Sequence, residues 1–512
     1  MSLIKSAATI SGLTLVSRIT GVIRDMLIAR YFGASAATDA FYVAFRLPNI
    51  LRRLFAEGAF QQAFVPMLSD VRENATPERC ARFIDHVFTV LGLAVLGASV
   101  LGVLVAPVLV WLIASGLAEN PEAFDLASAL TRFMFPYIAF MSLVALAASI
   151  LNTLKHFAIP AATPVLLNIS FIGFTVFAAP YLDEPIWALA AAVIVGGVLQ
   201  LGTQVLALAR LGVIIRPRGV RESFADDGVK RVMKLMVPAL FGVGVAQLSI
   251  IINTNIASHL GHGAVTWLNY ADRLMEFPTA LLGTALGTVL LPGLSAAYAK
   301  SDDVRYNRLL DHGLRLVMLV GVPASIGLWL TADALVAFLF QGQNFTPADV
   351  AKTGAAVVGY AVGLIGLIAL KIVAPAFYAR KDIRTPVKVA FLSLVVVQLV
   401  NLVAVPLFSH AGLALSVGLG SCVNAATLLV LLRRRGIYSP LSGWGRYLLR
   451  VLAGSAVMGA ALWFGQRGLD WSTMTWTVRA AGVLGMVAAA ALLYFAVISL
   501  FGWRLSDIRP KD

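Results

Sequence analysis

The sequence is poor in charged residues and nearly free of cysteine. Only 13% of its 512 residues are Asp, Glu, Lys or Arg, against about 25% in a typical soluble domain, so a soluble enzyme is excluded. Cys80 and Cys422 lie far apart and form no metal or redox spacing. His259 and His262 could face one another at a helix end, but the sequence offers no neighbouring carboxylate as a third ligand, so a metal site is not expected there. No GxxxxGK[ST] loop is present. We therefore expect no metal, no cofactor and no nucleotide-driven motor.

Long apolar runs make up most of what is present. Val87–Ile113 and Ala480–Phe501 exceed the ~18 apolar residues that mark a membrane-spanning helix. The strands of an outer-membrane barrel are shorter and alternate in polarity, so a barrel is excluded. The sequence predicts an all-α polytopic membrane protein with 14 transmembrane helices, near residues 7–31, 36–69, 83–114, 124–151, 159–181, 185–210, 232–259, 264–297, 311–337, 351–377, 386–407, 411–432, 446–466 and 477–502.

The connections are short, and their charges predict the topology. The longest, of about 20 residues near 211–231, is too short for a folded domain, so no separate catalytic head is expected. With both termini in the cytoplasm, 28 of the 40 Lys and Arg residues fall in inner segments and three in outer connections. The net charge of +14 is thus mainly a topology signal and an attraction to membrane lipids, and no nucleic-acid partner is expected.

The first apolar segment begins like a signal peptide, with Lys5 ahead of a run to Ser17. Arg18, Arg24 and Asp25 follow at once, and no Ala-x-Ala cleavage site stands out. We therefore expect this segment to be retained as the first transmembrane helix.

Nine basic residues remain within the predicted spans. At about 2.5–3.5 kcal/mol each at a helix centre, their total cost is on the order of 25 kcal/mol, which is too large to be accidental. Arg30 and Arg132 can reach the membrane surface by snorkelling, whereas Arg18, Arg24 and Arg273 cannot do so as readily. We expect these residues to face a hydrated cavity. The nine are Arg18, Arg24, Arg30, Arg46, Arg52, Arg53, Arg132, Arg273 and Lys371.

Six of these nine fall in the first two predicted helices, where helical periodicity groups them. Ser17, Gly21 and Arg24 share one face of the first helix, and Arg18 and Asp25 share another. The second helix carries a polar stripe with spacing i, i+3, i+7 and i+11, flanked by one further arginine and bent by a proline. The stripe consists of Arg46, Asn49, Arg53 and Glu57. The flanking arginine is Arg52, and the proline is Pro48.

Three interpretations compete for this charged cluster. Arginine–carboxylate pairing could serve only to hold helices together. A cation or proton relay requires acids to outnumber bases, but five acids (Asp25, Asp39, Glu57, Asp272 and Glu276) face nine bases. An anion site agrees best with the excess of basic over acidic residues, because planar guanidinium groups bind phosphate oxygens in bidentate fashion. The sequence therefore favours a phosphate-bearing anion that enters the membrane interior.

A weak internal repeat predicts two lobes. Residues 44–48 resemble residues 271–275, and 66–69 resemble 292–295, at offsets of 227 and 226; Gly33 and Gly261 precede the two helices similarly. These matches pair helices 1–2 with helices 7–8. They imply six-helix lobes over 1–215 and 216–440, related by an axis along the membrane normal, plus two carboxyl-terminal helices over 441–512.

With these residues in view, the sequence resembles the MurJ (MviN) family of lipid II flippases, within the multidrug/oligosaccharidyl-lipid/polysaccharide exporter superfamily. The resemblance is densest in SRITGVIRD (17–25), GASAATDAF (33–41) and FRLPNILRRLFAEGAF (45–60). It returns in LNYADRLMEFP (268–278) and at Leu291-Pro292. Span number and lobe spacing agree, so the resemblance covers essentially the whole chain.

The resemblance implies a transporter, not an enzyme. It would carry undecaprenyl-diphosphate-linked MurNAc-pentapeptide-GlcNAc to the outer leaflet of the bacterial cytoplasmic membrane by alternating access, with helices 13 and 14 forming a groove for the lipid tail. Cell-wall synthesis proteins are further candidate partners, and we expect a monomer. Some relatives place a sodium ion among helices 7, 11 and 12, where this chain offers neutral residues (Asn253, Asn401 and Asn424), so that site is not carried over.

The resemblance also assigns roles to residues. The family's cavity arginines, which would hold the diphosphate, match Arg18, Arg24, Arg52 and Arg273. Acidic positions tied to arginine orientation or gating match Asp25, Asp39 and Glu57, and a portal residue matches Ser17. Position 46 is Arg where some members have Lys. We expect Arg46, Asn49, Arg53 and Glu276 to support the cavity.

Two other function classes stay open. The first is another exporter of the same superfamily, such as a drug or oligosaccharide-lipid antiporter, although a cation-drug exporter requires an acidic cavity. The second is a membrane transferase that uses polyprenyl phosphate. Such an enzyme needs clustered metal-binding acids or a base at a loop mouth, and no DxD or close carboxylate pair lies in a long enough connection.

Overall fold

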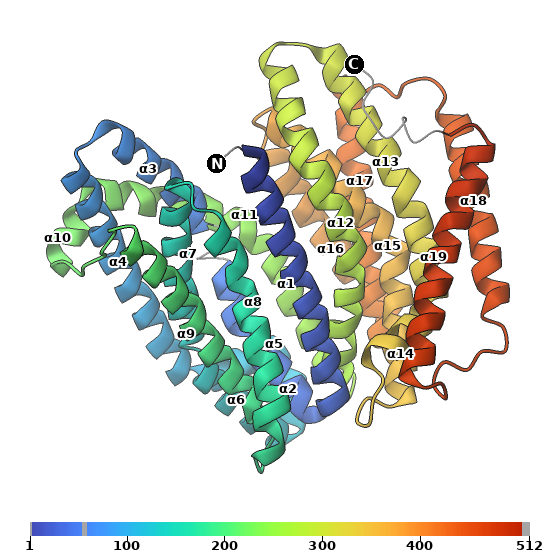
Figure 1. The fold of residues 1–512 in the computed structure, drawn as a ribbon, viewed down its shortest axis with the longest axis horizontal. Helices are drawn as coiled ribbons and strands as arrows, with labels where there is room; N and C mark the ends of the chain where they lie inside the picture. Colours follow the sequence, from blue (N-terminus) through green and yellow to red (C-terminus); the bar gives the residue numbers. More distant parts are fainter. Residues whose placement is uncertain (1–2, 54–58, 504–512) are drawn as a thin grey trace. The chain divides into compact units, whose positions relative to one another are not determined.

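The computed structural model describes residues 3–53 and 59–503, with the backbone alone at 3–8, 10–11, 239, 241–243, 245–246 and 280–289. Its regular elements are all helical, which confirms the all-α fold class (Figure 1). The α-helices are α1 Leu3–Phe32, α2 Ala36–Leu51, α3 Gln61–Asn74, α4 Pro77–Leu104, α5 Ala106–Ala114, α6 Pro121–Met134, α7 Tyr137–Thr153, α8 Ala158–Gly173, α9 Ile186–Arg210, α10 Val220–Ala225, α11 Asp227–Ser258, α12 Ala264–Ala299, α13 Asp303–Leu330, α14 Ala332–Phe340, α15 Pro347–Ala379, α16 Arg384–Phe408, α17 His410–Arg434, α18 Trp444–Gly465 and α19 Trp476–Leu500.

Ten stretches in the described residues are long and apolar enough to cross a membrane. They coincide with ten of the 14 predicted spans. The other four predictions, 7–31, 36–69, 232–259 and 264–297, are helical as α1, α2 with α3, α11 and α12. The chain is therefore a multi-pass membrane protein. Seven of the nine basic residues in the predicted spans lie in or next to α1, α2 and α12, which are among the helices that the predicted internal repeat relates.

Several predicted spans are broken into two helices. Span 83–114 is α4 and α5, which meet at Val105, and span 124–151 is α6 and α7, which meet at Phe135 and Pro136. Proline lacks a backbone N–H and clashes with the preceding turn. Pro107 and Pro136 therefore interrupt the backbone hydrogen bonds of the helix, although the apolar run continues through them. Span 311–337 is likewise α13 and α14, separated by Thr331.

Some helices also begin earlier than hydropathy predicts. The helix α4 starts at Pro77 after the N-cap Thr76, whose side chain accepts the backbone N–H of Arg79. The helix α13 starts at Asp303 after the N-cap Asp302. These ends are set by capping chemistry, which extends a helix beyond its apolar run.

Packing divides the chain into two compact units. Unit 1 comprises Met1–Thr266 with Gly342–Asn344, and unit 2 comprises Trp267–Gln341 with Phe345–Asp512. The predicted lobes are defined by sequence similarity instead, and the division into lobes over 1–215 and 216–440 stays a prediction. Gly33 and Gly261, which precede α2 and α12, both have positive φ angles of 65° and 96°, so the two turns share a conformation that favours glycine.

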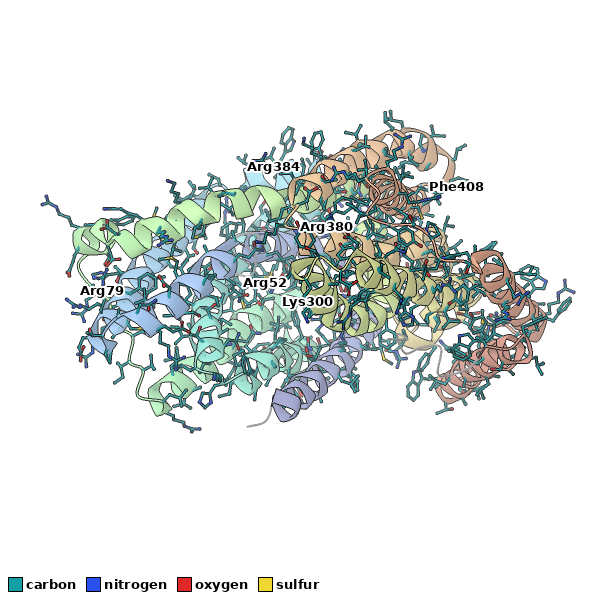
Figure 2. All side chains as sticks on the ribbon, turned by 90° about the horizontal axis from the view of Figure 1, so that it is seen from above. Arg52, Arg79, Lys300, Arg380, Arg384 and Phe408 are labelled. Atoms are coloured by element: carbon teal, nitrogen blue, oxygen red, sulfur yellow. The ribbon has the colours of Figure 1, made fainter. Side chains whose placement is uncertain are left out.

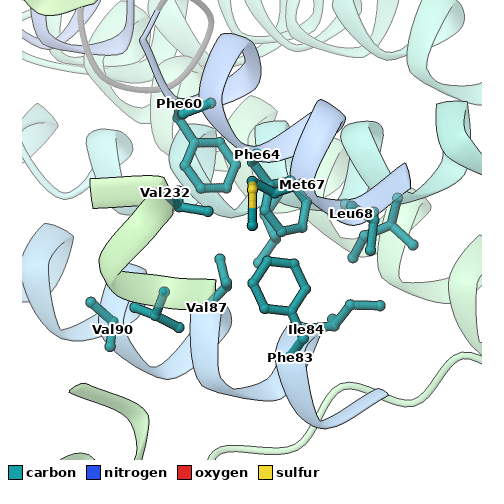
Figure 3. Close-up of a cluster of buried hydrophobic side chains, with 14 of the residues drawn as sticks. Phe60, Phe64, Met67, Leu68, Phe83, Ile84, Val87, Val90 and Val232 are labelled. Atoms are coloured by element: carbon teal, nitrogen blue, oxygen red, sulfur yellow. The ribbon is translucent and has the colours of Figure 1, made fainter. Parts of the chain in front are cut away.

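Unit 1 has an apolar core where α3, α4, α7, α9 and α11 meet (Figure 3). Three stacked aromatic rings form its centre. The ring centroids of Phe60 and Phe64 are 5.0 Å apart, and those of Phe64 and Phe83 are 5.8 Å apart. All three side chains are at most 2% exposed. Stacked pairs of this kind contribute about 0.5–1.5 kcal/mol beyond burial, and they join the segment after α2 to α4.

In unit 2 the carboxyl-terminal helices α18 and α19 pack on α13. The Tyr494 hydroxyl donates to the carbonyl of Leu319 at 2.6 Å. In the first half of α13 the buried carboxylate of Asp311 accepts hydrogen bonds from four groups: Arg315 Nε, the Tyr438 hydroxyl, the Leu441 N–H and Trp444 Nε1. These bonds attach the segment before α18 to α13.

Candidate functional site

Arg24 is held by three neighbouring side chains. Its Nε and Nη2 lie 2.9 and 2.7 Å from the same oxygen of Asp25, and its Nη1 lies 3.0 Å from Asn168 Oδ1 on α8. The guanidinium carbon lies 5.4 Å from the centroid of the Phe171 ring, within cation–π range. A guanidinium group has five N–H donors. Within the described residues three of them are used, which leaves two for a further acceptor.

The predicted face of α1 is the side that meets α8. Asn168 Nδ2 donates to the carbonyl of Ser17 at 2.9 Å and to Thr20 Oγ1 at 3.0 Å. A Cβ atom on Gly21 would lie 3.6 Å from the same nitrogen. Ser17, Gly21 and Arg24 therefore all border one buried carboxamide. The sequence offered a signal for Asn168, which is a polar residue inside the apolar span 159–181, but our sequence reasoning did not use it.

Arg18 lies on a different part of α1. It is partly exposed, and among the described residues it has no hydrogen-bond or ion-pair partner. Asp25, which shares a predicted face with Arg18, pairs with Arg24 instead. The N–H donors of Arg18 are therefore available to another ligand.

The polar stripe of the second helix splits into separate contacts. Arg46 Nη1 donates to Thr254 Oγ1 on α11. Asn49 Oδ1 accepts from Arg52 Nε at 3.2 Å, so the amide orients a neighbouring guanidinium group. Arg53 is exposed. Glu57 lies outside the described residues.

Asp39 is buried at the start of α12, with 2% of its surface exposed. Its carboxylate accepts the N–H of Gly263 at 2.6 Å, the N–H of Thr266 at 2.9 Å and the Thr266 hydroxyl at 2.7 Å. An acidic side chain at a helix amino terminus satisfies free N–H groups and complements the helix dipole. Its contacts thus join α2 to α12.

Arg273 and Glu276 lie on α12 in unit 2. Arg273 Nη1 is 3.3 Å from Glu276 Oε2, and both side chains are about half exposed, at 43% and 52%. An exposed pair of this length contributes little to stability. Arg132 and Lys371, by contrast, are exposed on α6 and α15. No group of three metal-binding side chains occurs in the described part of the chain.

Comparison with known proteins identifies the family. Residues 28–482 match the family model described as lipid II flippase MurJ. A lipid II flippase MurJ from Burkholderia cenocepacia is 48% identical over 100% of both chains. A probable lipid II flippase MurJ from Vibrio cholerae is 35% identical over 99% of this chain and 98% of that protein. The chain belongs to the MurJ family.

The MurJ fold agrees with this assignment. A solved lipid II flippase MurJ in an inward closed conformation has a TM-score of 0.82, with 24% identity over 96% of this chain and 98% of that one. An inward-facing multidrug resistance MATE family transporter has a TM-score of 0.69, with 12% identity over 84% and 98% of the two chains. At these identities the structural matches establish the fold alone. MurJ proteins are named flippases, so this member is a transporter and not an enzyme.

Proposed function

We propose that this protein is a lipid II flippase, which moves undecaprenyl-diphosphate-linked MurNAc-pentapeptide-GlcNAc from the inner to the outer leaflet of the bacterial cytoplasmic membrane. The 48% identity over the full length to a relative of that name supports the proposal most directly. The excess of arginine over carboxylate in α1, α2 and α12 supports it independently, because a diphosphate is the anionic part of this substrate.

The diphosphate is bound by Arg18, Arg24, Arg52 and Arg273. Arg24 offers two N–H groups beyond those that Asp25 and Asn168 occupy. Arg18 has no competing partner among the described residues, and the pair that Arg273 makes with Glu276 is long and solvated. Arg18 and the two remaining N–H groups of Arg24 can therefore bind phosphate oxygens without the loss of a buried ion pair.

Transport proceeds by alternating access without ATP hydrolysis. The polar headgroup enters between the lobes, and its polyprenyl tail stays in lipid along α18 and α19. Rocking of the lobes then closes the inner side and opens the outer side. A membrane potential of 100 mV changes the energy of each transferred charge by about 2.3 kcal/mol, so it biases either substrate export or the return step.

The test is complementation of bacterial cells depleted of their own lipid II flippase. Arg24→Ala and Arg273→Ala are expected to abolish growth and to cause lipid II to accumulate in the inner leaflet. Arg24→Lys is expected to restore growth in part, because lysine keeps the charge and loses the planar fork. Arg132→Ala, on an exposed surface of α6, is the matched control and is expected to support normal growth.

Normal growth with both Arg24→Ala and Arg273→Ala would exclude the diphosphate site. If the wild-type chain restored no growth although it was present in the membrane, the flippase assignment itself would be wrong, and a drug or oligosaccharide-lipid antiporter would become the better candidate.

A further inference from the structure

Asn168 connects α8 to α1 through three hydrogen bonds. Its carboxamide nitrogen donates to the carbonyl of Ser17 and to Thr20 Oγ1, and its oxygen accepts from Arg24 Nη1. Only an N–H group can donate to a carbonyl, so the Ser17 contact determines which end of the amide faces Arg24. Asn168 is 6% exposed, so these are its partners within unit 1 and bulk water does not replace them.

The contact restrains Arg24 on a side that Asp25 does not reach. Asp25 holds the edge formed by Nε and Nη2, Asn168 holds Nη1, and the Phe171 ring lies 5.4 Å from the guanidinium carbon. The Arg24 side chain is only 12% exposed. Three neighbours thus determine the plane of the guanidinium group and the direction of its two remaining N–H donors.

We propose that Asn168 is the positioning residue for Arg24, and that it aims the two free N–H groups at the diphosphate. This inference rests on the proposed function. A neutral amide suits the role, because it accepts a hydrogen bond without cancelling the arginine's charge. A second carboxylate at this position would hold Arg24 equally well, but it would compete with the phosphate oxygens for the same cation.

The test measures the affinity of purified full-length protein for lipid II, using Arg24→Ala, Asn168→Ala and the double variant. Asn168→Ala is expected to weaken binding about tenfold, the size of one lost hydrogen bond to a charged group. In the Arg24→Ala background the same change is expected to have almost no further effect, because Asn168 acts through Arg24. A purely structural role would lower affinity by the same factor in both backgrounds.

Two further variants keep the test decisive. Asn168→Asp keeps the shape of the side chain and an acceptor for Arg24, but it loses the donated bond to the Ser17 carbonyl. Its binding is therefore measured well below its own unfolding midpoint, and it is expected to bind lipid II more weakly than the wild type. Thr20→Val removes only the other α1 side-chain partner of Asn168 and is expected to bind normally. Full affinity in both Asn168 variants, or additive losses in the double variant, would overturn the inference while wild-type binding stands. Absence of wild-type binding would instead count against the proposed function.

Discussion

Arg24 and Asp39 are both charged residues with little exposure in unit 1, and in each case other groups take the place of water. Arg24 has a carboxylate, an amide and an aromatic ring around it. Asp39 has two backbone N–H groups and one hydroxyl from the start of α12. The two residues differ in the hydrogen-bonding capacity that remains. Arg24 keeps two N–H donors without an acceptor in the described residues, whereas the carboxylate of Asp39 accepts three hydrogen bonds from the protein. Arg24 is therefore suited to binding an anionic substrate, and Asp39 to stabilising the fold.

Replacement of Asp39 by alanine is expected to destabilise the protein by about 3 kcal/mol, because it leaves buried donors of Gly263 and Thr266 without acceptors. Asp39→Asn keeps one acceptor oxygen and is expected to lose less. The measurement is the thermal unfolding midpoint of the detergent-solubilised protein. Asp125→Ala, which removes an exposed acid on α6, is the control. An unchanged midpoint for Asp39→Ala would contradict this role.

At the scale of whole helices, α15 and α17 approach each other closely in unit 2. A Cβ atom built on Gly363 would lie 2.0 Å from the Gly418 Cα, and one built on Gly366 would lie 2.5 Å from the Cys422 backbone nitrogen. In a membrane the surrounding lipid is as apolar as the side chains, so helices associate through close packing of this kind. The glycines therefore serve contact between backbones.

Gly363→Ala is expected to separate α15 from α17 and to destabilise the protein by about 1–3 kcal/mol, the cost of overpacking a tight contact. Gly202→Ala on α9 is the matched control, because its Cβ meets nothing within 4 Å. That control is expected to be neutral or to gain up to about 1 kcal/mol from helix propensity. Equal unfolding midpoints for the two variants would show that the α15–α17 contact is not tight.

The connection between α15 and α16 contains an acid with a shifted pKa. Burial acts to raise the pKa of Asp382, but hydrogen bonds from Thr385 and the guanidinium group of Arg435 outweigh it and hold the pKa at about 2. Because the pKa of Asp382 is lower in the folded state than in the unfolded chain, its ionised form stabilises the protein at pH values above the ordinary pKa of an aspartate. This contribution disappears as the pH falls from about 4 towards 2.

We therefore expect Asp382→Asn to cost about 1 kcal/mol at pH 7, after allowance for solvent screening, and to cost progressively less below about pH 4. Unfolding midpoints of the wild type and the variant, measured across this range, should converge at low pH. A difference that stays constant with pH would indicate that Asp382 acts through its shape and not through its charge.

For the whole molecule, the distribution of charge sets the orientation in the membrane. Basic residues gather in the connections that we assign to the cytoplasm, whereas only three lie in the opposite ones. The prediction that both termini are cytoplasmic depends on this asymmetry together with an even number of spans.

The orientation can be tested with single cysteines in a chain whose Cys80 and Cys422 are replaced by serine. Lys300→Cys, after α12, is expected to react with a membrane-impermeant maleimide only in permeabilised cells (Figure 2). Asp183→Cys, in the exposed connection between α8 and α9, is expected to react in spheroplasts without permeabilisation. The reverse pattern would invert the topology.

The sequence by itself determined the fold class, the membrane spans and the candidate arginines. These follow from composition and periodicity, because lipid demands about 20 apolar residues per helix and penalises every charge inside it. A charged residue inside a predicted span therefore indicates a functional site from the sequence alone. Helix ends and breaks were less predictable. Thr76, Asp302 and Pro136 act through local backbone hydrogen bonding, which mean hydropathy over a window of residues does not reflect.

Only the tertiary structure decided which partners those charges have. Spacing along one helix placed Asp25 on the face of Arg18, yet the carboxylate pairs with Arg24. Asn168 lies more than 140 positions from Arg24 in the chain and meets it only because α8 packs against α1. Likewise, Asp39 finds its donors in α12. Side-chain hydrogen bonds act over about 3 Å, so chain folding has to bring such groups together before their chemistry can be assigned.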